Sequence, residues 1–251
     1  MVFTQEIPGV RIVGGSDASR RVECEALAAA RKDAHVLITG ARGVGKAVVA
    51  RFIHQHSDRA TQGFAMLNCE GLPDLLAESE LFGHVRGSFA GAYQDKPGLF
   101  ESVPGGSVFL GEVGALSARM QALLLRFLET GEFRRVGSDL VRKAIDIRVI
   151  ASTTANLPAR VVAGLFLDDL YGRLNATGLS VPPLRDRRDD IPSLVDHFVG
   201  QFAGRNVQSD VPPISKEVYA ALCRGEWPGN VRELRRVVLR QLLNASTSAP
   251  R

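Results

Sequence analysis

Short apolar runs alternate with segments of helical periodicity along the first 180 residues of the chain. Four runs rich in β-branched or aromatic residues predict buried strands, at residues 35–39, 64–68, 107–110 and 146–152. Apolar positions at three- and four-residue steps predict helices over 45–56 and 120–129, and a further short apolar piece covers 179–181. Because strands and helices alternate, we expect βα units and a parallel sheet, which places this part of the chain in the α/β class.

The pattern of charged and apolar residues changes after the double proline Pro182-Pro183. A charged stretch over 185–190 follows, and beyond it the apolar pattern is helical only, at 191–202, 215–223 and 230–243. We therefore expect two domains, an α/β core over residues 1–184 and a smaller helical domain over 185–245. The last residues, 246–251, predict a flexible tail.

Composition narrows the class of protein without identifying a partner. The chain has 251 residues, 45% of them hydrophobic, with a net charge of +4 and a pI of about 9.2. These values exclude collagen-like, coiled-coil and disordered classes, and the mild basic excess permits an acidic partner such as a nucleotide. No apolar run approaches the roughly 18 residues of a membrane span, and the N-terminus lacks a signal-peptide pattern. We expect a soluble cytoplasmic protein that does not bind membranes.

The cysteines and histidines do not form a metal-binding pattern. Cys24, Cys69 and Cys223 are far apart in the sequence and lack the spacing of a disulfide framework or a zinc site, so we predict reduced thiols. His54 and His56 have no acidic or cysteine neighbours, and we interpret them as surface histidines. Three arginines of the last predicted helix recur at helical spacing, which indicates a solvated stripe rather than a nucleic-acid face: Arg235, Arg236 and Arg240.

The strongest chemical motif lies between the first predicted strand and the first predicted helix. It reads G-x-x-x-x-G-K, and its residues are Gly40, Ala41, Arg42, Gly43, Val44, Gly45 and Lys46. Glycines let successive N–H groups point at phosphate oxygens, the helix N-terminus adds partial positive charge, and the lysine reaches the β- and γ-phosphates. The alternative, a glycine-rich turn with an unrelated lysine, is weaker because a strand and a helix flank the motif as it requires. The motif departs at Ala47, where a Ser or Thr would contact Mg²⁺.

Several longer motifs resemble the AAA+ domain of sigma-54-dependent transcription activators, the bacterial enhancer-binding proteins. The signature loop of that family reads GAFTGA, and this chain has GSFAGA within the stretch ELFGHVRGSFAGA at 80–92. Other matching stretches keep the family's order, at 67–69, 131–137, 169–175, 182–187 and 227–234. The resemblance covers residues 10–242 and implies a P-loop core of three layers around a parallel sheet, followed by a small helical lid domain.

The resemblance also implies cofactors and partners. Members of the family bind ATP with Mg²⁺, assemble into rings, usually hexamers, and contact the sigma-54 RNA polymerase holoenzyme through the signature loop. By position, the polymerase-contacting residues are Gly87, Ser88, Phe89, Ala90, Gly91 and Ala92. Glycines permit a tight, mobile tip, and we expect Phe89 to be an exposed aromatic that can bury against the partner, the alternative being a core residue beneath the loop. Ala90 replaces the threonine with which the family engages sigma-54.

The groups that the resemblance assigns to ATP hydrolysis are only partly retained. Glu112 matches the carboxylate that polarises the attacking water, and Asn68 and Arg232 match the glutamate-switch and sensor positions. Gly111, however, replaces the metal-associated aspartate, and Leu167 replaces an arginine that reaches the neighbouring subunit's site.

Two further positions carry catalytic roles by resemblance. Thr154 stands where the family has an Asn that senses the γ-phosphate, and Arg173 keeps the second arginine of its segment. With neither Ala47 nor Gly111 able to contact Mg²⁺, the ion would be held by phosphates, water or Glu112. Because an arginine finger contributes about 10³–10⁵ in rate and a positioned acid or base about 10²–10⁴, we expect weakened hydrolysis.

Two functional hypotheses stay open on the sequence. The first is an ATP-binding AAA+ module of a sigma-54-type transcription regulator with weakened hydrolysis. The second is a pseudo-ATPase, an interaction or assembly subunit that regulates an active homologue or transcription without remodelling. Contact with DNA would need a domain outside these 251 residues, because no helix-turn-helix pattern follows residue 242.

Overall fold

The computed structural model describes residues 9–143, 146–205 and 214–248, which divide into two compact units. Neither unit is continuous in the sequence. Most of the larger unit comes from Glu25–Thr39 and Ala47–Leu179, whereas the smaller unit combines Arg11–Cys24, Gly40–Lys46 and the chain from Ser180 onward. The predicted boundary between residues 184 and 185 stays a prediction, and two early segments of the chain group with the smaller unit.

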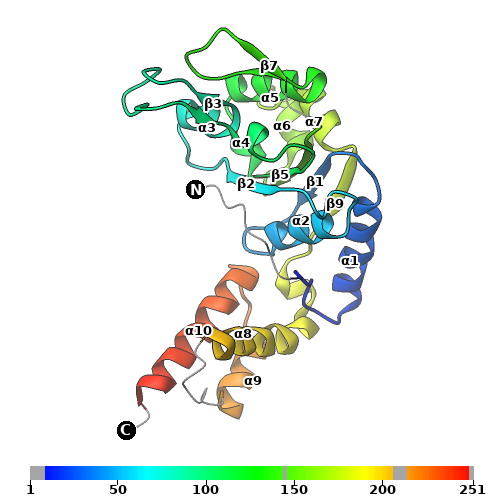
Figure 1. Cartoon of the computed structure of the whole chain (residues 1–251). Helices are drawn as coiled ribbons and strands as arrows, with labels where there is room; N and C mark the ends of the chain where they lie inside the picture. The colour runs from blue at the N-terminus through cyan, green and yellow to red at the C-terminus, as the bar shows by residue number, and fades with distance from the viewer. Residues whose placement is uncertain (1–8, 144–145, 206–213, 249–251) are drawn as a thin grey trace. The chain divides into compact units, whose positions relative to one another are not determined.

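A five-stranded sheet forms the centre of the larger unit (Figure 1). Its strand order is β2-β5-β8-β1-β9, and β2, β5, β8 and β1 pair in parallel. The strands are β1 (Val36–Thr39), β2 (Phe64–Asn68), β5 (Ser107–Gly111), β8 (Arg148–Thr153) and β9 (Thr177–Ser180). Every residue of β5 and β8 is buried, as expected for central parallel strands that are covered on both faces.

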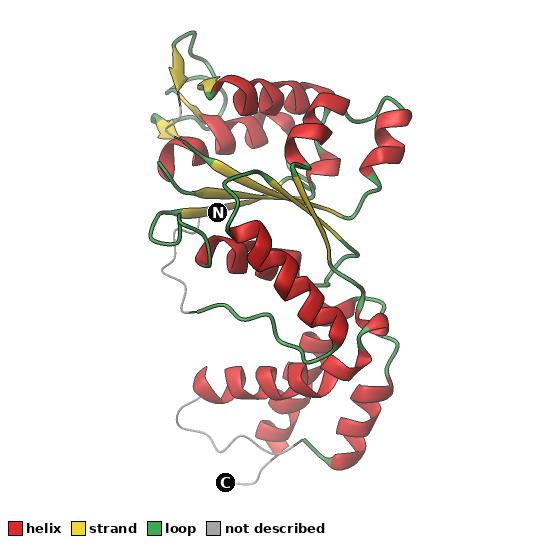
Figure 2. Ribbon diagram, turned by 90° about the vertical axis from the view of Figure 1, so that its right-hand side faces the viewer, coloured by secondary structure: helices red, strands yellow, loops and turns green. Residues whose placement is uncertain are grey.

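Helices cover both faces of this sheet, so the larger unit has three layers (Figure 2). One face carries α2 (Lys46–Gln55) and the C-terminal half of α1 (Asp17–Ala30). On the other face the buried residues of five helices form one hydrophobic core with the strands. These helices are α3 (Asp74–Phe82), α4 (Leu99–Ser102), α5 (Ala118–Thr130), α6 (Leu157–Val162) and α7 (Asp168–Leu174).

Two short hairpins and a 3₁₀ turn complete the larger unit. Strands β3 (Gly83–His84) and β4 (Lys96–Pro97) pair antiparallel, as do β6 (Glu132–Arg134) and β7 (Val141–Lys143). The 3₁₀ turn η1 (Val113–Ala115) follows β5 directly. The α/β class and the parallel sheet predicted from the sequence are confirmed.

The predicted strands and helices exist, and their ends differ for local reasons. Helix α5 begins earlier than predicted because the Ser117 side chain accepts a hydrogen bond from the Met120 N–H and caps the first turn. Strand β8 begins at Arg148 rather than 146, since Asp146 has a left-handed backbone with φ of 39°. Strand β9 starts at Thr177, two residues before the apolar piece at 179–181.

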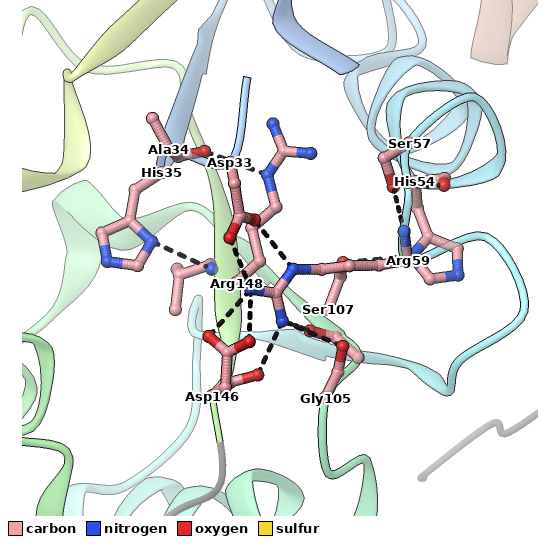
Figure 3. A network of polar contacts seen from close by, with 12 residues as sticks. Asp33, Ala34, His35, His54, Ser57, Arg59, Gly105, Ser107, Asp146 and Arg148 are labelled. Atoms are coloured by element: carbon pink, nitrogen blue, oxygen red, sulfur yellow. Dashed lines mark hydrogen bonds and ion pairs between the residues drawn. The ribbon is translucent and has the colours of Figure 1, made fainter. Parts of the chain in front are cut away.

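A buried arginine joins the C-terminal end of α1 to the start of β8, and Figure 3 shows its contact with Ala34. Arg148 is 2% exposed, and its guanidinium donates to the carbonyls of Ala29 (2.7 Å), Ala30 (3.5 Å) and Ala34 (2.9 Å). The last carbonyls of a helix lack partners within the helix, and the C-terminal end of its dipole attracts positive charge. Arg148 therefore acts as a buried cap, although burial lowers its pKa.

A second arginine lies beside it and ties three loops together (Figure 3). Arg59 forms paired contacts with Asp33 (2.8 and 2.9 Å) and Asp146 (2.8 and 2.9 Å), and also donates to the carbonyl of Gly105 (2.9 Å). The hydrogen bonds from Arg59 lower the pKa of the Asp33 carboxyl. These contacts hold the turns before β1, β5 and β8 at the amino ends of the strands.

The interpretation of His54 as a surface residue is wrong. His54 is 5% exposed, and its ring Nδ1 lies 3.0 Å from the Ser107 hydroxyl (Figure 3). Burial lowers the pKa of His54, so the ring is neutral at pH 7. The helical pattern did not identify it because α2 lies against the sheet, which buries a wider face of the helix than its apolar residues mark. His56 is exposed, as predicted.

The smaller unit has its own hydrophobic core. Its helices are α8 (Ile191–Arg205), α9 (Lys216–Arg224) and α10 (Asn230–Ser248), preceded by the 3₁₀ turns η2 (Leu184–Asp186) and η3 (Arg188–Asp190). Apolar residues of these elements pack together, among them Leu184, Ile191 and Leu234, each fully buried. Helix α10 continues through Ser248, into the segment predicted as a flexible tail, and residues 249–251 lie outside the described residues.

A buried carboxylate fixes an N-terminal segment within the smaller unit. Asp190 is 0% exposed and accepts hydrogen bonds from the Ser16 N–H (2.8 Å), the Ser16 hydroxyl (2.9 Å) and the Ser19 hydroxyl (2.5 Å). Three donors compensate the burial of a single carboxylate. This network explains why residues 11–24 group with helices that follow them by more than 150 positions.

Backbone segments approach very closely at Gly43. A Cβ atom there would lie 2.3 Å from the Gly229 carbonyl oxygen and 3.1 Å from the Arg232 Cβ, and Gly43 has φ of 81°. Both the conformation and the space therefore require glycine.

Within the described residues, the structure contains no helix that is long and apolar enough to cross a membrane.

We expect Arg148→Met to lower the free energy of unfolding by about 2–4 kcal/mol, because it leaves buried carbonyls without their charged donor. Urea unfolding followed by far-UV circular dichroism measures this. Arg126→Met is the matched control, since among the described residues the Arg126 side chain makes only an exposed ion pair with Glu132 (3.6 Å), and its loss should change stability by less than about 1 kcal/mol. Equal effects of the two variants would contradict the capping role.

We expect Gly43→Ala to destabilise the smaller unit by about 2 kcal/mol or more, because the added Cβ collides with backbone at a left-handed residue. The fluorescence of Trp227, the only tryptophan of the chain, reports unfolding of this unit. Gly200→Ala is the control: its Cβ would meet nothing within 4 Å, and alanine should stabilise α8 by up to about 1 kcal/mol. A neutral Gly43→Ala would refute the steric argument.

Candidate functional site

The predicted phosphate loop follows β1 directly and turns into α2. Its three glycines have positive φ angles, 149° at Gly40, 81° at Gly43 and 108° at Gly45, so the loop uses a backbone that other residues rarely adopt. The Lys46 side chain is 8% exposed, and its Nζ donates to the carbonyls of Gly40 (2.8 Å) and Ala41 (3.4 Å). The ammonium group therefore lies over the loop rather than in solvent.

The first turn of α10 lies against this loop. The Arg232 backbone N–H donates to the Gly43 carbonyl (3.2 Å), and the Asn230 side-chain Nδ2 donates to the Arg42 carbonyl (2.9 Å). Arg232, predicted to sense nucleotide, is exposed, and its Cβ lies close to Gly43 of the loop. The structure therefore brings together two parts of the predicted nucleotide site that are almost 190 positions apart in the sequence.

A third group contacts the loop from the same unit. Arg187, 5% exposed, donates from Nη2 to the Val44 carbonyl (2.8 Å) and from Nη1 to the Ser19 hydroxyl (3.3 Å). Burial lowers the pKa of Arg187, and the negative charge of Asp190 opposes that shift. Ala47, the next residue after Lys46, lies in α2 and has no polar side-chain atom.

The groups predicted to act in hydrolysis meet at the carboxyl edge of the sheet in the larger unit. Glu112 follows β5, and its Oε2 accepts hydrogen bonds from the Thr154 N–H (2.8 Å) and the Thr154 hydroxyl (2.8 Å). Glu112 also has a left-handed backbone with φ of 57°. A non-glycine residue rarely adopts this conformation, and such strain is concentrated at functional positions.

Asn68 and Gly111 lie side by side at the same edge. They are register partners at the ends of β2 and β5, and a Cβ added at Gly111 would lie 3.2 Å from the Asn68 Oδ1. Cys69, the next residue, is buried, and burial together with the charge of Glu112 raises the pKa of its thiol to about 12. This edge therefore gathers three of the predicted catalytic residues, while Gly111 contributes no side chain.

The fourth predicted catalytic residue lies elsewhere in the larger unit. Arg173 is on α7 and forms an exposed ion pair with Glu129 of α5 (3.0 Å). Leu167, at the position that resembles an arginine, precedes α7 and is 38% exposed. Both side chains point to the surface, where a neighbouring molecule can reach them.

The signature loop has a defined conformation between β3 and β4. The Gly87 N–H donates to the Ala92 carbonyl (2.8 Å), and the Ala92 N–H donates to the Phe89 carbonyl (3.0 Å). Gly87 and Gly91 have φ of 79° and 106°, as a tight tip requires. Ala92 is buried, and Ala90 is exposed.

The expectation that Phe89 is an exposed aromatic is wrong. Phe89 is half-buried, and its ring packs edge-on against His84 with 5.0 Å between the ring centroids. His84 is itself buried, with its Nδ1 2.7 Å from the Ser79 hydroxyl. The exposed aromatic of this region is Tyr93, at 86% exposure. Sequence reasoning missed Tyr93 because it follows the six-residue motif instead of belonging to it.

Sequence reasoning also missed Asn230 and Arg187 as contacts of the phosphate loop. Both occur in stretches that carry the family resemblance, and that was the available signal. Their role could not be deduced from spacing, because it depends on how the smaller unit folds around residues 40–46.

Comparisons with known proteins identify the family. The sigma-54 interaction domain family matches residues 12–180, and the AAA+ ATPase lid domain family matches residues 185–249. The chain is 43% identical over 239 residues to the anaerobic nitric oxide reductase transcription regulator NorR of Vibrio vulnificus, covering 95% of this chain and 46% of that protein. It is 45% identical over 214 residues to the regulatory protein AtoC of Escherichia coli, covering 85% of this chain and 46% of that protein.

The solved structures agree with these matches. NtrX from Brucella abortus, in complex with ADP and with ATP, superposes with a TM-score of 0.84 and 35% identity, covering 97% of this chain and 54% of that one. The AAA+ fold extends to Hsp104, with a TM-score of 0.62 and 19% identity. The chain spans about half the length of the curated relatives that it matches. It belongs to the sigma-54 interaction domain family, and its fold is an AAA+ α/β core followed by a helical lid domain.

Proposed function

We propose that this chain is the ATP-binding AAA+ module of a sigma-54-type transcription regulator in which ATP hydrolysis is weakened. Family membership supports the general role of a transcription regulator. The observation that carries the finer proposal is the contrast between an intact phosphate loop and a β5 strand that ends at Gly111, without a carboxylate.

Nucleotide binding rests on the groups around residues 40–46. A triphosphate needs positive charge and hydrogen-bond donors. Here they come from the glycine-rich backbone, the Lys46 ammonium, the N-terminal end of α2 and Arg232. NtrX, solved with ATP and with ADP, has the same fold and 35% identity. In this proposal Lys46 holds the β- and γ-phosphates, and Gly40, Ala41, Arg42, Gly43, Val44, Gly45 and Ala47 form the remaining cradle.

The donor set for Mg²⁺ is poor. Ala47 and Gly111 have no oxygen in their side chains, and Glu112 is the one carboxylate of the predicted set. Since Mg²⁺ prefers carboxylate, phosphate and water oxygens, these residues do not fit a protein-held ion in the usual position. The residues therefore fit a nucleotide better than they fit its metal.

Glu112 would polarise water in this proposal, with Thr154 holding its carboxylate and Asn68 beside it. Two hydrogen bonds from Thr154 fix Oε2 in one orientation. Phosphoryl transfer also needs a positive group placed against the negative charge of the transferring phosphoryl group, and Leu167 cannot supply one whereas Arg173 can. Weak turnover follows, because positioning is retained while two electrostatic groups are missing.

The partner surface in this proposal is the loop from Gly87 to Ala92, acting on sigma-54 RNA polymerase holoenzyme in the cytoplasm. Its hydrogen-bonded tip exposes Ala90, and Tyr93 beside it offers an aromatic surface. A hydroxyl at position 90 would add a donor and acceptor at the tip, and its absence is expected to weaken engagement.

A specific surface supports the alternative, a pseudo-ATPase that assembles with an active homologue or with itself in a ring. Three apolar residues of α6 and the segment before α7 are exposed, Val162 at 90%, Leu165 at 60% and Leu167 at 38%. Clustered exposed apolar residues of this kind are typical of protein–protein contacts. In a mixed ring a homologue can supply the missing arginine in trans.

We expect the wild-type chain to bind ADP and ATP but to release phosphate slowly. Gly111→Asp combined with Leu167→Arg should raise the turnover number at least about 10-fold, since each restores an electrostatic group. The Cβ of the new aspartate would lie 3.2 Å from the Oδ1 of the exposed Asn68 side chain, which must shift by a few tenths of an ångström, and position 167 is exposed. Phosphate release is measured at several protein concentrations.

Lys46→Ala in the restored double variant is the control, and it should abolish the gain. No gain in the double variant, or wild-type turnover equal to it, would overturn the account of weakened hydrolysis. Binding of a fluorescent ATP analogue by the wild-type chain, with no measurable release of phosphate from ATP, would favour the pseudo-ATPase.

We expect Ala90→Thr to strengthen capture of purified sigma-54 holoenzyme at least several-fold in the presence of a non-hydrolysable ATP analogue. The added hydroxyl lies at the exposed tip and leaves the two hydrogen bonds that shape it intact. Ala163→Thr, on an exposed residue after α6, is the matched control and should have no effect. Binding that is unchanged by Ala90→Thr and by deletion of the loop tip would refute this surface.

A further inference from the structure

Five consecutive carbonyl groups of the phosphate loop, at residues 40–44, accept hydrogen bonds from donors of the smaller unit. Lys46 Nζ contacts the first two, at Gly40 and Ala41. The next three accept hydrogen bonds from residues that follow the double proline: Asn230 Nδ2 on Arg42 (2.9 Å), the Arg232 N–H on Gly43 (3.2 Å) and Arg187 Nη2 on Val44 (2.8 Å). Five consecutive carbonyls are thus directed toward donors of the protein.

The planar peptide group converts this arrangement into an orientation of the amides. In a trans peptide the carbonyl of one residue and the N–H of the next point in opposite directions. Since the carbonyls of residues 42–44 point toward the segment that follows Ser180, the N–H groups of Gly43, Val44 and Gly45 point away from it. Consecutive amides turned to one side form the concave nest that binds anions.

The charge of Arg187 has a second effect, on the strength of the Gly45 N–H as a donor. Arg187 is a cationic donor, and a hydrogen bond to a charged group is stronger and shorter than a neutral one. A donor on the carbonyl polarises the whole peptide group, which makes the N–H of the same group a better donor. The guanidinium on the Val44 carbonyl therefore strengthens the Gly45 N–H on the opposite side of the loop.

Asn230 is suited to its position for three reasons at once. Its backbone is left-handed, with φ of 53°, and asparagine is among the few non-glycine residues that tolerate this conformation. Its Oδ1 accepts the Leu184 N–H (2.8 Å), while its Nδ2 donates to the Arg42 carbonyl. The side chain, 4% exposed, thus connects the start of α10, the turn η2 and the phosphate loop.

Stability alone is a weak reason to bury Arg187. Arg187 is only 5% exposed, and its Nε has no hydrogen-bond partner among the described residues. Burying a charged group with an unsatisfied donor costs free energy of folding, so a role beyond stability would explain why Arg187 is buried. Asp190 helps through Ser19, which donates to Asp190 (2.5 Å) and accepts from Arg187 (3.3 Å).

We propose that Arg187 and Asn230 are positioning residues that preset the phosphate loop for the β-phosphate of the nucleotide. They act through the carbonyls of Val44 and Arg42 and do not touch the ligand themselves. This inference rests on the proposed nucleotide binding and deepens it. It makes phosphate affinity depend on the packing of the smaller unit, so that any change in that packing alters nucleotide binding without altering the loop sequence.

The test compares four variants of the full chain by calorimetric titration with ADP. Arg187→Met removes the cationic donor and keeps an apolar stem, Arg187→Lys restores a charged donor, and Asn230→Asp keeps the acceptor for Leu184 but loses the donor to Arg42. Arg188→Met is the matched control, because the one contact of the Arg188 side chain within the described part of the chain is an exposed ion pair with Glu226 (2.8 Å).

We expect the affinity for ADP to fall about 10- to 100-fold in Arg187→Met and Asn230→Asp, to recover in part in Arg187→Lys, and to stay within about 2-fold in Arg188→Met. Amide resonances of the nucleotide-free protein provide the second readout. The Gly45 N–H signal should move in Arg187→Met and the Gly43 N–H signal in Asn230→Asp, whereas a purely structural role would not select these amides.

The outcomes separate this inference from the proposed function. Failure of the wild-type chain to bind ADP or ATP overturns the proposed function and this inference with it. Normal wild-type binding, with Arg187→Met and Asn230→Asp within about 2-fold of it, overturns the inference alone. If Arg187→Met does not fold, judged by Trp227 fluorescence, Arg187→Lys and Asn230→Asp decide: unchanged affinity and unmoved Gly43 and Gly45 signals in both refute it.

Discussion

Burial of the parallel sheet on both faces is the constraint on which the rest of the larger unit depends. The central strands are covered on both faces and most of their residues are apolar, so the groups predicted to act in hydrolysis lie at or just beyond the carboxyl ends of the strands. Because parallel strands end at one edge, Asn68 at the end of β2 lies at the same edge as Glu112 and Thr154, which directly follow β5 and β8. Strand β1 ends at the same edge with Thr39, and the phosphate loop begins at the next residue.

The smaller unit is stabilised in a different way. Its apolar core is small, and buried polar groups link its separate segments: Asp190 with Ser16 and Ser19, and Arg187 with Ser19 and Val44. Hydrogen bonds have directional requirements that apolar contacts lack, so this network constrains the phosphate-loop backbone at Val44 as well as stabilising the unit. A loop with three left-handed glycines would otherwise have much conformational freedom.

The departures from the family pattern are confined to one part of the molecule. By resemblance, these departures are Ala47, Ala90, Gly111, Thr154 and Leu167, all in the larger unit, whereas Arg187 and Asn230, which donate to phosphate-loop carbonyls, belong to the smaller unit. Binding of a triphosphate and its hydrolysis make different physical demands, since binding needs oriented donors and hydrolysis needs charge placed for the transition state. The proposed function follows from this separation.

The sequence by itself determined the α/β class, the strands and helices near their observed positions, and the phosphate loop, because apolar periodicity and a glycine-rich motif are local signals. The family resemblance added the roles proposed for Glu112, Asn68 and Arg232. Only the tertiary structure decided that His54 is buried, that Phe89 packs on His84, and that Tyr93 is the exposed aromatic. It also showed that Arg187 and Asn230 hold the loop carbonyls. Burial and hydrogen bonding between residues more than 140 positions apart depend on how the chain folds back on itself, and no local pattern contains that information.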